Sequence, residues 1–352
     1  QLGIDPEAAL ETLIIENQGR TPEFTEVIAS NTEDQKDKKT EEEPSPRSPY
    51  MPTDLDDVRI GEDIPEDIEM CLVEIARNAA HNGLPEILQN RLMQLVKKYA
   101  SVWRKSLGPD SPAKVTPFQT QLKPNSVPFR CKNRRYSEED SKFLEEFVSE
   151  LLKYGLIEEN YNSKWASPVS VVRKADGGRR MTVDLRGVNA LCESTVWPMP
   201  FMEAIVNHLA GSKFWFKLDA FKGFWMMPLA EECREMFSFA TDKGVYTPRR
   251  SIQGALNSAT QFQARMYEVF KSLIYKKLII WIDDLLGYCN SYEDWFCSLE
   301  ATLKRAEQYN IKFNVAKCDL FANRVKFCGR LFSPEGVEHD RERIDALIKI
   351  PQ

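Results

Sequence analysis

The feature that most constrains this chain is an apolar stretch interrupted by two adjacent carboxylates, Leu278-Ile279-Ile280-Trp281-Ile282-Asp283-Asp284-Leu285-Leu286-Gly287-Tyr288. Ile and Trp favour strands, so the stretch predicts a strand, a tight turn carrying the Asp pair, and a second strand. Like charges held together at the end of a buried strand repel each other, and a hard cation such as Mg²⁺ relieves that repulsion. An Asp pair is also ordinary turn chemistry. Other parts of the sequence are needed to distinguish these two interpretations.

Charge is unevenly distributed along the 352 residues. Residues 1–70 hold 20 Asp or Glu against 6 Lys or Arg, and the whole chain has a net charge of −6, so residues 71–352 carry a net charge of +8. The acidic part is rich in Pro, Ser and charge, which predicts a mostly disordered leader or linker with a short helix near residues 7–15. The basic remainder is compatible with a partner that bears phosphate.

Several classes of protein are excluded by composition. No run of about 18 apolar residues predicts a membrane span, and no secretory signal precedes the first helix. The eight cysteines form no CxxC pair and there are only three histidines, so a zinc site is not expected. We expect the cysteines to be free thiols in a reducing compartment. We expect the ends of the chain, Gln1 and Gln352, to be cuts through a longer polypeptide.

Hydrophobic periodicity predicts most of the remaining elements. A helix is expected from Leu84 to near Gly108, followed by a weak edge strand over residues 116–122. Ser137 caps a second helix that ends near Gly155. Later helices and strands are expected in the following order: strand 214–220, hairpin 237–247, a long helix containing Phe262 and Phe270, a helix containing Trp295 and Leu303, strand 311–313, and hairpin 325–332.

A basic hairpin is the second chemical feature. Residues 167–174 and 179–186 read as strands joined by the turn Asp176-Gly177-Gly178. Lys174 and Arg180 would then lie near its tip, where two cations suit a triphosphate. Without further context, a solvated basic hairpin is the better explanation of this pattern.

A third carboxylate, Asp219, ends the apolar strand Phe214-Trp215-Phe216-Lys217-Leu218-Asp219. Because a hairpin and a helix separate it from Asp283, the two strands can lie side by side in one antiparallel sheet. Two Mg²⁺ ions held between these carboxylates would support an in-line phosphoryl transfer.

These blocks, in this order, resemble the reverse transcriptase of gypsy-type LTR retrotransposons, which is related to the retroviral enzyme. The matching blocks cover about residues 84–345, and they are Leu151-Leu152-Lys153-Tyr154-Gly155-Leu156-Ile157, Trp165-Ala166-Ser167-Pro168-Val169, residues 174–189, Leu218-Asp219-Ala220 to Phe224, Gln253-Gly254-Ala255-Leu256-Asn257 with Phe262-Gln263, Trp281-Ile282-Asp283-Asp284, and Phe327-Cys328-Gly329-Arg330. The order and spacing of the blocks make the resemblance specific, although each block alone is weak.

The resemblance implies an α+β right-hand polymerase with fingers and palm, in which an antiparallel palm sheet packs on helices and the thumb is largely missing. The expected divisions are a leader (1–70), a helical segment (71–115), fingers (116–205, with 233–257), palm (206–335) and a truncated start of thumb or connection (336–352). Protease, RNase H and integrase are expected in parts of a polyprotein outside this chain.

The resemblance also implies roles for particular residues. Asp219, Asp283 and Asp284 would be the catalytic metal ligands for two Mg²⁺ or Mn²⁺ ions. Lys174 (with Arg173 as a register alternative) and Arg180 would contact the phosphates of the incoming dNTP, and Gln253 would contact both nucleotide and template. Phe224 would act as a steric gate against the 2′-hydroxyl of a ribonucleotide. The hairpin Phe327 to Arg330 would grip the primer terminus.

The implied partners are an RNA template, a DNA or tRNA primer and dNTPs, with no membrane. The implied location is intracellular, in a cytoplasmic particle or the nucleus.

The family usually has Tyr at the positions of Trp281 and Phe224, so we expect Trp281 to crowd the primer end. Asn257-Ser258-Ala259 also lacks the usual Pro. Two other interpretations are a non-catalytic remnant of an element, degenerate or repurposed, and a viral RNA-directed RNA polymerase. Phe224 and the hairpin from Lys174 to Arg186 argue against the viral polymerase.

Overall fold

The structure, a computed structural model, describes residues 65–132, 134–173 and 177–339. Lys174, the predicted helix at 7–15, and most of the predicted leader and thumb segment lie outside this range. None of the helices within it is long and apolar enough to cross a membrane. All eight cysteines are described and unpaired. Four of them are buried, whereas Cys297 is exposed.

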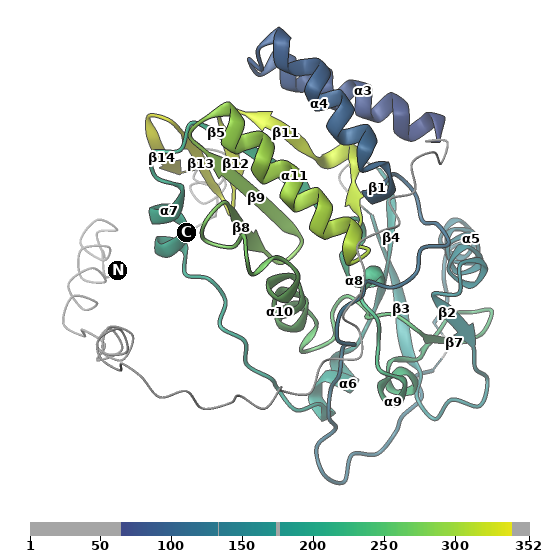
Figure 1. Ribbon diagram of the computed structural model, residues 1–352. Helices are drawn as coiled ribbons and strands as arrows, with labels where there is room; N and C mark the ends of the chain where they lie inside the picture. The colour runs from purple at the N-terminus through teal and green to yellow at the C-terminus, as the bar shows by residue number, and fades with distance from the viewer. Residues whose placement is uncertain (1–64, 133, 174–176, 340–352) are drawn as a thin grey trace, which may run out of the picture. The chain divides into compact units, whose positions relative to one another are not determined.

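A four-stranded antiparallel sheet carries the three aspartates (Figure 1). Its strands, in spatial order, are β11 (Asp319–Ala322), β5 (Phe214–Asp219), β9 (Asp284–Cys289) and β8 (Leu278–Trp281). The predictions of a strand, turn and strand around the Asp pair, and of a neighbouring Asp219 strand, are confirmed. The sequence did not predict β11, which is short and pairs with β5 through an irregular register.

One face of this sheet packs on α10 (Ser258–Phe270) and α11 (Tyr292–Gln308), which agree with the two predicted helices. Because side chains alternate along a strand, Phe216 and Leu218 of β5 point to this face. They join a large hydrophobic cluster with residues such as Phe262 and Trp295. Fully burying each side chain of this size stabilises the fold by about 1.5–3 kcal/mol.

The opposite face carries Trp215, Ile279 and Leu286 in a separate cluster. This cluster is completed by α7 (Met202–Leu209) and by the sheet β12 (Val325–Phe327), β13 (Arg330–Ser333) and β14 (Gly336–His339). The β12–β13 hairpin confirms the prediction for residues 325–332. The third strand, β14, was not predicted.

A five-stranded sheet forms the second part of the described structure. Its strands, in spatial order, are β2 (Ile157–Glu159), β7 (Val245–Pro248), β6 (Phe239–Ala240), β3 (Ser167–Arg173) and β4 (Arg179–Val183). Short helices α6 (Arg186–Leu191), α8 (Gly223–Met226) and α9 (Glu231–Arg234) and the 3₁₀ turn η2 (Glu235–Phe237) accompany it. The two predicted hairpins pair as expected, although β4 ends at Val183 because α6 begins at Arg186.

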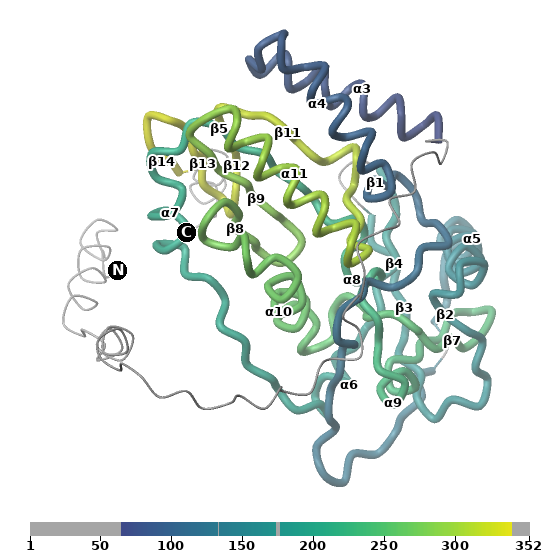
Figure 2. The backbone as a smooth tube through the Cα atoms, in the orientation of Figure 1, coloured from purple at the N-terminus to yellow at the C-terminus, as the bar shows by residue number. Residues whose placement is uncertain are grey.

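Helix α5 (Glu138–Lys153) packs on this sheet through Leu144, Val148 and Leu151. Its predicted caps are present: the Asp140 backbone N–H donates to Ser137 Oγ at 3.2 Å, and Gly155 has φ +64°. The predicted edge strand at 116–122 is wrong in detail, because this segment forms isolated bridges at Phe118 and Leu122. Between α6 and α7 the chain runs a long way without helix or strand (Figure 2).

The N-terminal part of the described chain differs most from the prediction. Helix α3 (Glu66–His81) begins inside the predicted leader, because Ile68, Leu72 and Ile75 are buried at helical spacing. Helix α4 (Glu86–Lys98) ends ten residues before Gly108, and the 3₁₀ turn η1 (Ala100–Val102) follows. The short strand β1 (Trp103–Arg104) then pairs in parallel with β10 (Phe313–Asn314).

Both N-terminal helices belong to the same hydrophobic cluster as β5 and α11. The Asn82 side-chain amide, at the end of α3, donates to the Phe321 carbonyl of β11 at 2.8 Å. The helices of the segment predicted at 71–115 therefore pack against the four-stranded sheet.

Candidate active site

Asp219 and Asp284 lie opposite each other at one end of the four-stranded sheet. Their Cα atoms are register partners across β5 and β9. Alternation along β5 places Asp219 on the same face as Trp215 and Lys217, and Asp284 shares that face with Leu286. Directly opposed side chains of like charge destabilise a sheet unless something neutralises them.

The third predicted carboxylate, Asp283, lies in the turn between β8 and β9 and is exposed. Its backbone carbonyl accepts a hydrogen bond of 2.8 Å from the Ala220 N–H, which ties the turn to the end of β5. The preceding residue, Ile282, has φ +53°. This is a costly conformation for a β-branched residue, so neighbouring groups must hold it in place.

Gln263, on α10, holds Ile282 in this backbone conformation. The Ile282 backbone N–H donates to Gln263 Oε1 at 2.6 Å, and Gln263 Nε2 donates to the Ile280 carbonyl at 3.0 Å. The amide is buried, so both hydrogen bonds are protected from water. The sequence patterns predict no role for Gln263. A buried amide within the apolar face of a predicted helix is the signal that could have identified it.

Two lysines that no sequence pattern indicates contact the carboxylates. Lys217 Nζ lies 3.0 Å from Asp284 Oδ1, and Lys317 Nζ lies 3.6 Å from Asp219 Oδ1. Burial raises the pKa of Asp219, Lys317 opposes that rise, and the charges of Asp283 and Asp284 add to it. The Asp219 backbone N–H also faces the buried Cys318 Sγ at 3.5 Å.

The donor chemistry of this cluster fits divalent metal ions. Three carboxylates meet at one strand end, and hard cations such as Mg²⁺ prefer carboxylate oxygens. Within the described residues, however, no three His, Cys, Asp or Glu side chains already surround a point that could hold an ion. Two of the three carboxylates are instead turned toward lysine ammonium groups.

Two predicted nucleotide-binding residues, Arg180 on β4 of the basic hairpin and Gln253 after β7, contact each other. Arg180 Nη2 donates a hydrogen bond to Gln253 Oε1, and both side chains are exposed. The neighbouring Arg179 has a different role, because it forms ion pairs with Glu139 and Asp140 of α5. Arg173 is exposed and is the register partner of Arg179.

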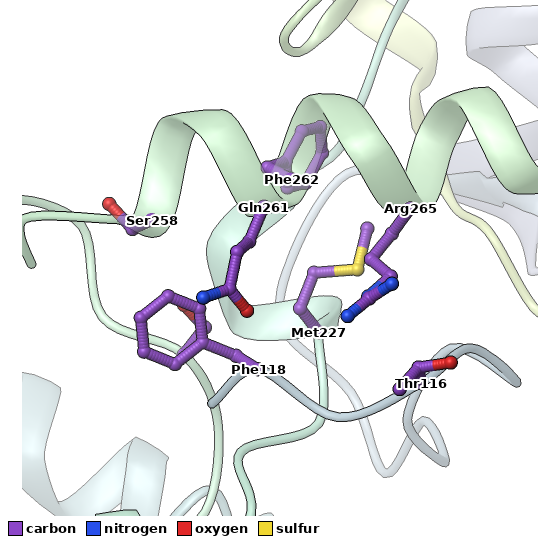
Figure 3. A pocket seen from close by; sticks show the side chains of 8 residues that line it. Thr116, Phe118, Met227, Ser258, Gln261, Phe262 and Arg265 are labelled. Atoms are coloured by element: carbon purple, nitrogen blue, oxygen red, sulfur yellow. The ribbon is translucent and has the colours of Figure 1, made fainter. Parts of the chain in front are cut away.

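Phe224 lies on α8, a few residues beyond Asp219. Its ring packs against Phe262 of α10, with the ring centroids 5.3 Å apart. Gly223 is required for this contact, because a Cβ there would lie 2.9 Å from the Phe262 ring. Figure 3 shows Phe262 and Arg265 projecting from α10 at a small pocket that Met227 also lines. Phe262, which packs against Phe224, is thus also one of the residues that line this pocket.

Trp281, at the end of β8, packs with Tyr288 and Cys328 against the cluster formed by Trp215 and Phe327. Cys328 and Gly329 both have positive φ and make the turn of the β12–β13 hairpin. The indole of Trp281 therefore belongs to the face of the sheet that the hairpin covers. Its predicted effect on a primer end stays a prediction.

Part of this chain is similar in sequence to known proteins. Residues 172–332 match the family model described as reverse transcriptase (RNA-dependent DNA polymerase). The chain is 27% identical over 213 residues to the retrovirus-related Pol polyprotein from transposon 297 of Drosophila melanogaster, covering 59% of this chain and 20% of that protein. It is 28% identical over 218 residues to the corresponding polyprotein from transposon gypsy of the same organism, covering 60% and 21%.

Among solved structures, the foamy viral protease-reverse transcriptase in complex with an RNA/DNA hybrid superimposes with a TM-score of 0.72 at 20% identity, covering 86% of this chain and 39% of that chain. This likeness concerns the fold. The chain spans about a fifth of the length of the curated relatives above. Its residues 172–332 are a reverse transcriptase domain related to those of gypsy-type LTR retrotransposon Pol polyproteins.

Proposed function

We propose that this domain catalyses RNA-directed DNA synthesis, adding dNTPs to a primer 3′-hydroxyl on an RNA or DNA template. The observation that carries the proposal is the register pairing of Asp219 with Asp284, beside Asp283 in the adjoining turn. This arrangement gathers three carboxylates at the end of one sheet. The foamy viral relatives were solved with an RNA/DNA hybrid and with double-stranded DNA, which supports a template–primer duplex as the partner here.

In this proposal the four-stranded sheet with α10 and α11 is the palm, and the five-stranded sheet with α5 is the fingers. The expected boundaries, 116–205 with 233–257 for fingers and 206–335 for palm, remain part of the proposal. The protein would work in a cytoplasmic particle or in the nucleus, next to protease, RNase H and integrase parts of a polyprotein.

Asp219, Asp283 and Asp284 would hold two Mg²⁺ or Mn²⁺ ions. Bound divalent ions favour phosphoryl transfer by stabilising charge on the attacking and leaving oxygens. Gln263 keeps the Asp283 turn in its strained conformation through Ile282. This pre-orders the carboxylates before substrate arrives, so that little reorganisation is needed during the reaction.

The remaining residues would bind and select the nucleotide. Arg180, oriented by Gln253, offers a planar guanidinium that can hold phosphate oxygens in a bidentate manner. Lys174 or Arg173 would add a second cation at the hairpin. Phe224, supported by Phe262, would exclude a 2′-hydroxyl from the sugar position.

Primer extension on poly(rA)/oligo(dT) with Mg²⁺ or Mn²⁺ tests this proposal. We expect dTTP incorporation by the wild-type chain and its loss in Asp283→Asn, a substitution at an exposed turn that leaves the sheet intact. Asp67→Asn, on the first turn of α3, makes the same chemical change away from the sheet end and should retain activity.

The competing interpretation is a folded, non-catalytic remnant. A fusion that supplies thumb and RNase H segments from a relative is therefore tested in parallel with the chain itself. If neither protein extends primers above the Asp283→Asn background, the domain is a non-catalytic remnant. Incorporation of ribonucleotides in preference to dNTPs would instead indicate an RNA polymerase.

A further inference from the structure

Lys312 is a buried lysine with no role in the proposed two-metal chemistry. It lies immediately before β10, and its side chain is 8% exposed. Its Nζ donates a hydrogen bond of 2.7 Å to the Ser101 carbonyl and lies 3.8 Å from Asp110 Oδ1. Because taking an ammonium group out of water is costly unless acceptors surround it, these contacts fix the side chain at this point.

The acceptors of this lysine belong to an ordered segment of the chain. Arg104 makes a bidentate ion pair with Asp110, through hydrogen bonds of 2.8 and 2.5 Å. Bidentate pairs between arginine and carboxylate fix geometry as well as adding energy. Ser101 lies in the 3₁₀ turn η1. Residues 101–110 precede the region that matches the family model, and they provide fixed acceptors for the Lys312 ammonium.

The backbone of Lys312 contacts both ends of α8, the short helix that carries Phe224. The Phe221 N–H donates to the Lys312 carbonyl at 2.9 Å, and the Lys312 N–H donates to Met226 Sδ at 3.1 Å. Lys222, just before α8, has φ +43°, a costly conformation for a residue other than glycine. A helix of one turn has little stability of its own, so contacts with the rest of the fold hold α8 in place.

We propose that Lys312 is a positioning residue for nucleotide selection. It fixes α8 against residues 101–110, so that the Phe224 ring keeps one position beside the sugar of the incoming nucleotide. The inference rests on the proposed function, because it takes Phe224 to be the steric gate. It assigns to Lys312 an action through α8 and no contact with substrate. Residues 101–110 are then part of the structure that selects the nucleotide.

Two further contacts support this assignment. The Ala113 N–H donates to the Met226 carbonyl at 2.9 Å, so the chain just after residues 101–110 also contacts the end of α8. An antiparallel bridge joins Ala220 to Phe313, next to Lys312, so β10 follows the turn after β5. A steric gate excludes a single hydroxyl group, and small displacements of a positioned group have large kinetic effects.

Hydrogen exchange and primer extension, both on the full chain, test the inference. The proteins compared with wild type are Lys312→Met, Asp110→Asn, Lys114→Met and Leu92→Ala. Lys312→Met keeps the length of the side chain and removes its ammonium group. Lys114→Met makes the same chemical change at an exposed lysine. Leu92→Ala removes buried volume on α4, in the hydrophobic cluster that also contains Met226.

We expect amide exchange in residues 221–227 to be about threefold or more faster in Lys312→Met than in wild type, because α8 has lost a support. On poly(rA)/oligo(dT), the ratio of kcat/KM for dTTP and UTP should fall by about three- to tenfold. Asp110→Asn weakens the acceptor side and should change both quantities in the same direction by less. Lys114→Met should match the wild type. Leu92→Ala should lower the melting temperature and leave the ratio within about twofold of wild type.

Unchanged exchange of residues 221–227 in Lys312→Met would overturn the inference. Faster exchange with an unchanged ratio would also overturn it, as would an equal fall of the ratio in Leu92→Ala. Failure of the proposed function gives a different result. If wild type extends no primer, or if Phe224→Val leaves the ratio unchanged, the selective role of Phe224 fails and that of Lys312 with it, whereas hydrogen exchange still decides whether Lys312 holds α8.

Discussion

Asp219 and Asp284 are register partners on adjacent antiparallel strands, and Lys317 and Lys217 each contact one of them. The sheet thus opposes two carboxylates at one end, an arrangement that costs free energy in an ordinary protein. A stability cost concentrated at one strand end is typical of a functional site.

Asp219→Asn should abolish primer extension without destabilising the fold. Burial raises the pKa of Asp219, so its charged form is the less favourable one in the folded state and a neutral isostere removes this cost. We expect the melting temperature to equal or exceed that of the wild type at pH 7, while incorporation falls by about 10³-fold or more. Thermal denaturation and primer extension on the same preparations check this.

Asp184→Asn is a control in which loss of the carboxylate charge should destabilise the fold. Arg186 lowers the pKa of Asp184 to about 2, so its carboxylate stabilises the fold at neutral pH, and this contribution is lost as pH falls from 3.8 toward 2. Asp184→Asn should therefore lower the melting temperature at pH 7. Equal melting behaviour of the two variants would contradict our account of the charge balance at the site.

Arg180 and Gln253 should act as a coupled pair. Arg180→Ala is expected to raise KM for dNTP by about tenfold, because a phosphate contact is lost. Gln253→Ala should do less, and the double variant should cost less than the product of the two single effects, since the partners share one hydrogen bond. Steady-state kinetics of the three variants test this coupling.

Arg179→Ala is the matched comparison for the hairpin. Arg179 pairs with Glu139 and Asp140 of α5, so its loss should leave KM for dNTP within about twofold and act mainly on stability. Additive effects of Arg180→Ala and Gln253→Ala would argue against a shared binding role.

Phe224→Val should relax discrimination against ribonucleotides by about tenfold or more, because a smaller side chain leaves room for the 2′-hydroxyl. Phe224→Tyr retains an aromatic face and should keep discrimination. The ratio of kcat/KM for dNTP and rNTP is the measurement. Unchanged ratios in Phe224→Val would remove Phe224 from the nucleotide site.

Gly287→Ala should destabilise the four-stranded sheet. Gly287 on β9 lies opposite Phe216 on β5, and an added Cβ would lie 2.0 Å from the Phe216 ring. We expect a loss of about 1–3 kcal/mol in the free energy of unfolding. Gly108→Ala, where the nearest contact is 3.7 Å, should be close to neutral.

Phe216→Leu provides the second arm of this experiment. Combined with Gly287→Ala, it should recover part of the lost stability, because the smaller side chain makes room for the methyl group. Strictly additive destabilisation would mean that the Phe216 ring is not the obstacle. Urea denaturation of the single and double variants gives the coupling free energy.

The sequence by itself determined much of this domain, because local signals agree with its fold. Alternating and continuous apolar runs predicted β5, β8 and β9, and the Ser137 cap with Gly155 predicted the ends of α5. Three strand-end aspartates in family order identified the candidate catalytic carboxylates. These features depend on residues close together in the chain, where spacing alone carries the information.

Only the tertiary structure decided how the carboxylates are held. Lys217 and Lys317 lie in unremarkable sequence, and their role follows from which strands pair and where η3 returns. Gln263 constrains Ile282 across a helix–sheet contact, and β11 forms from a short segment that pairs with β5 and contacts α3 and α11. Such contacts join residues distant in the chain, and no local periodicity encodes them.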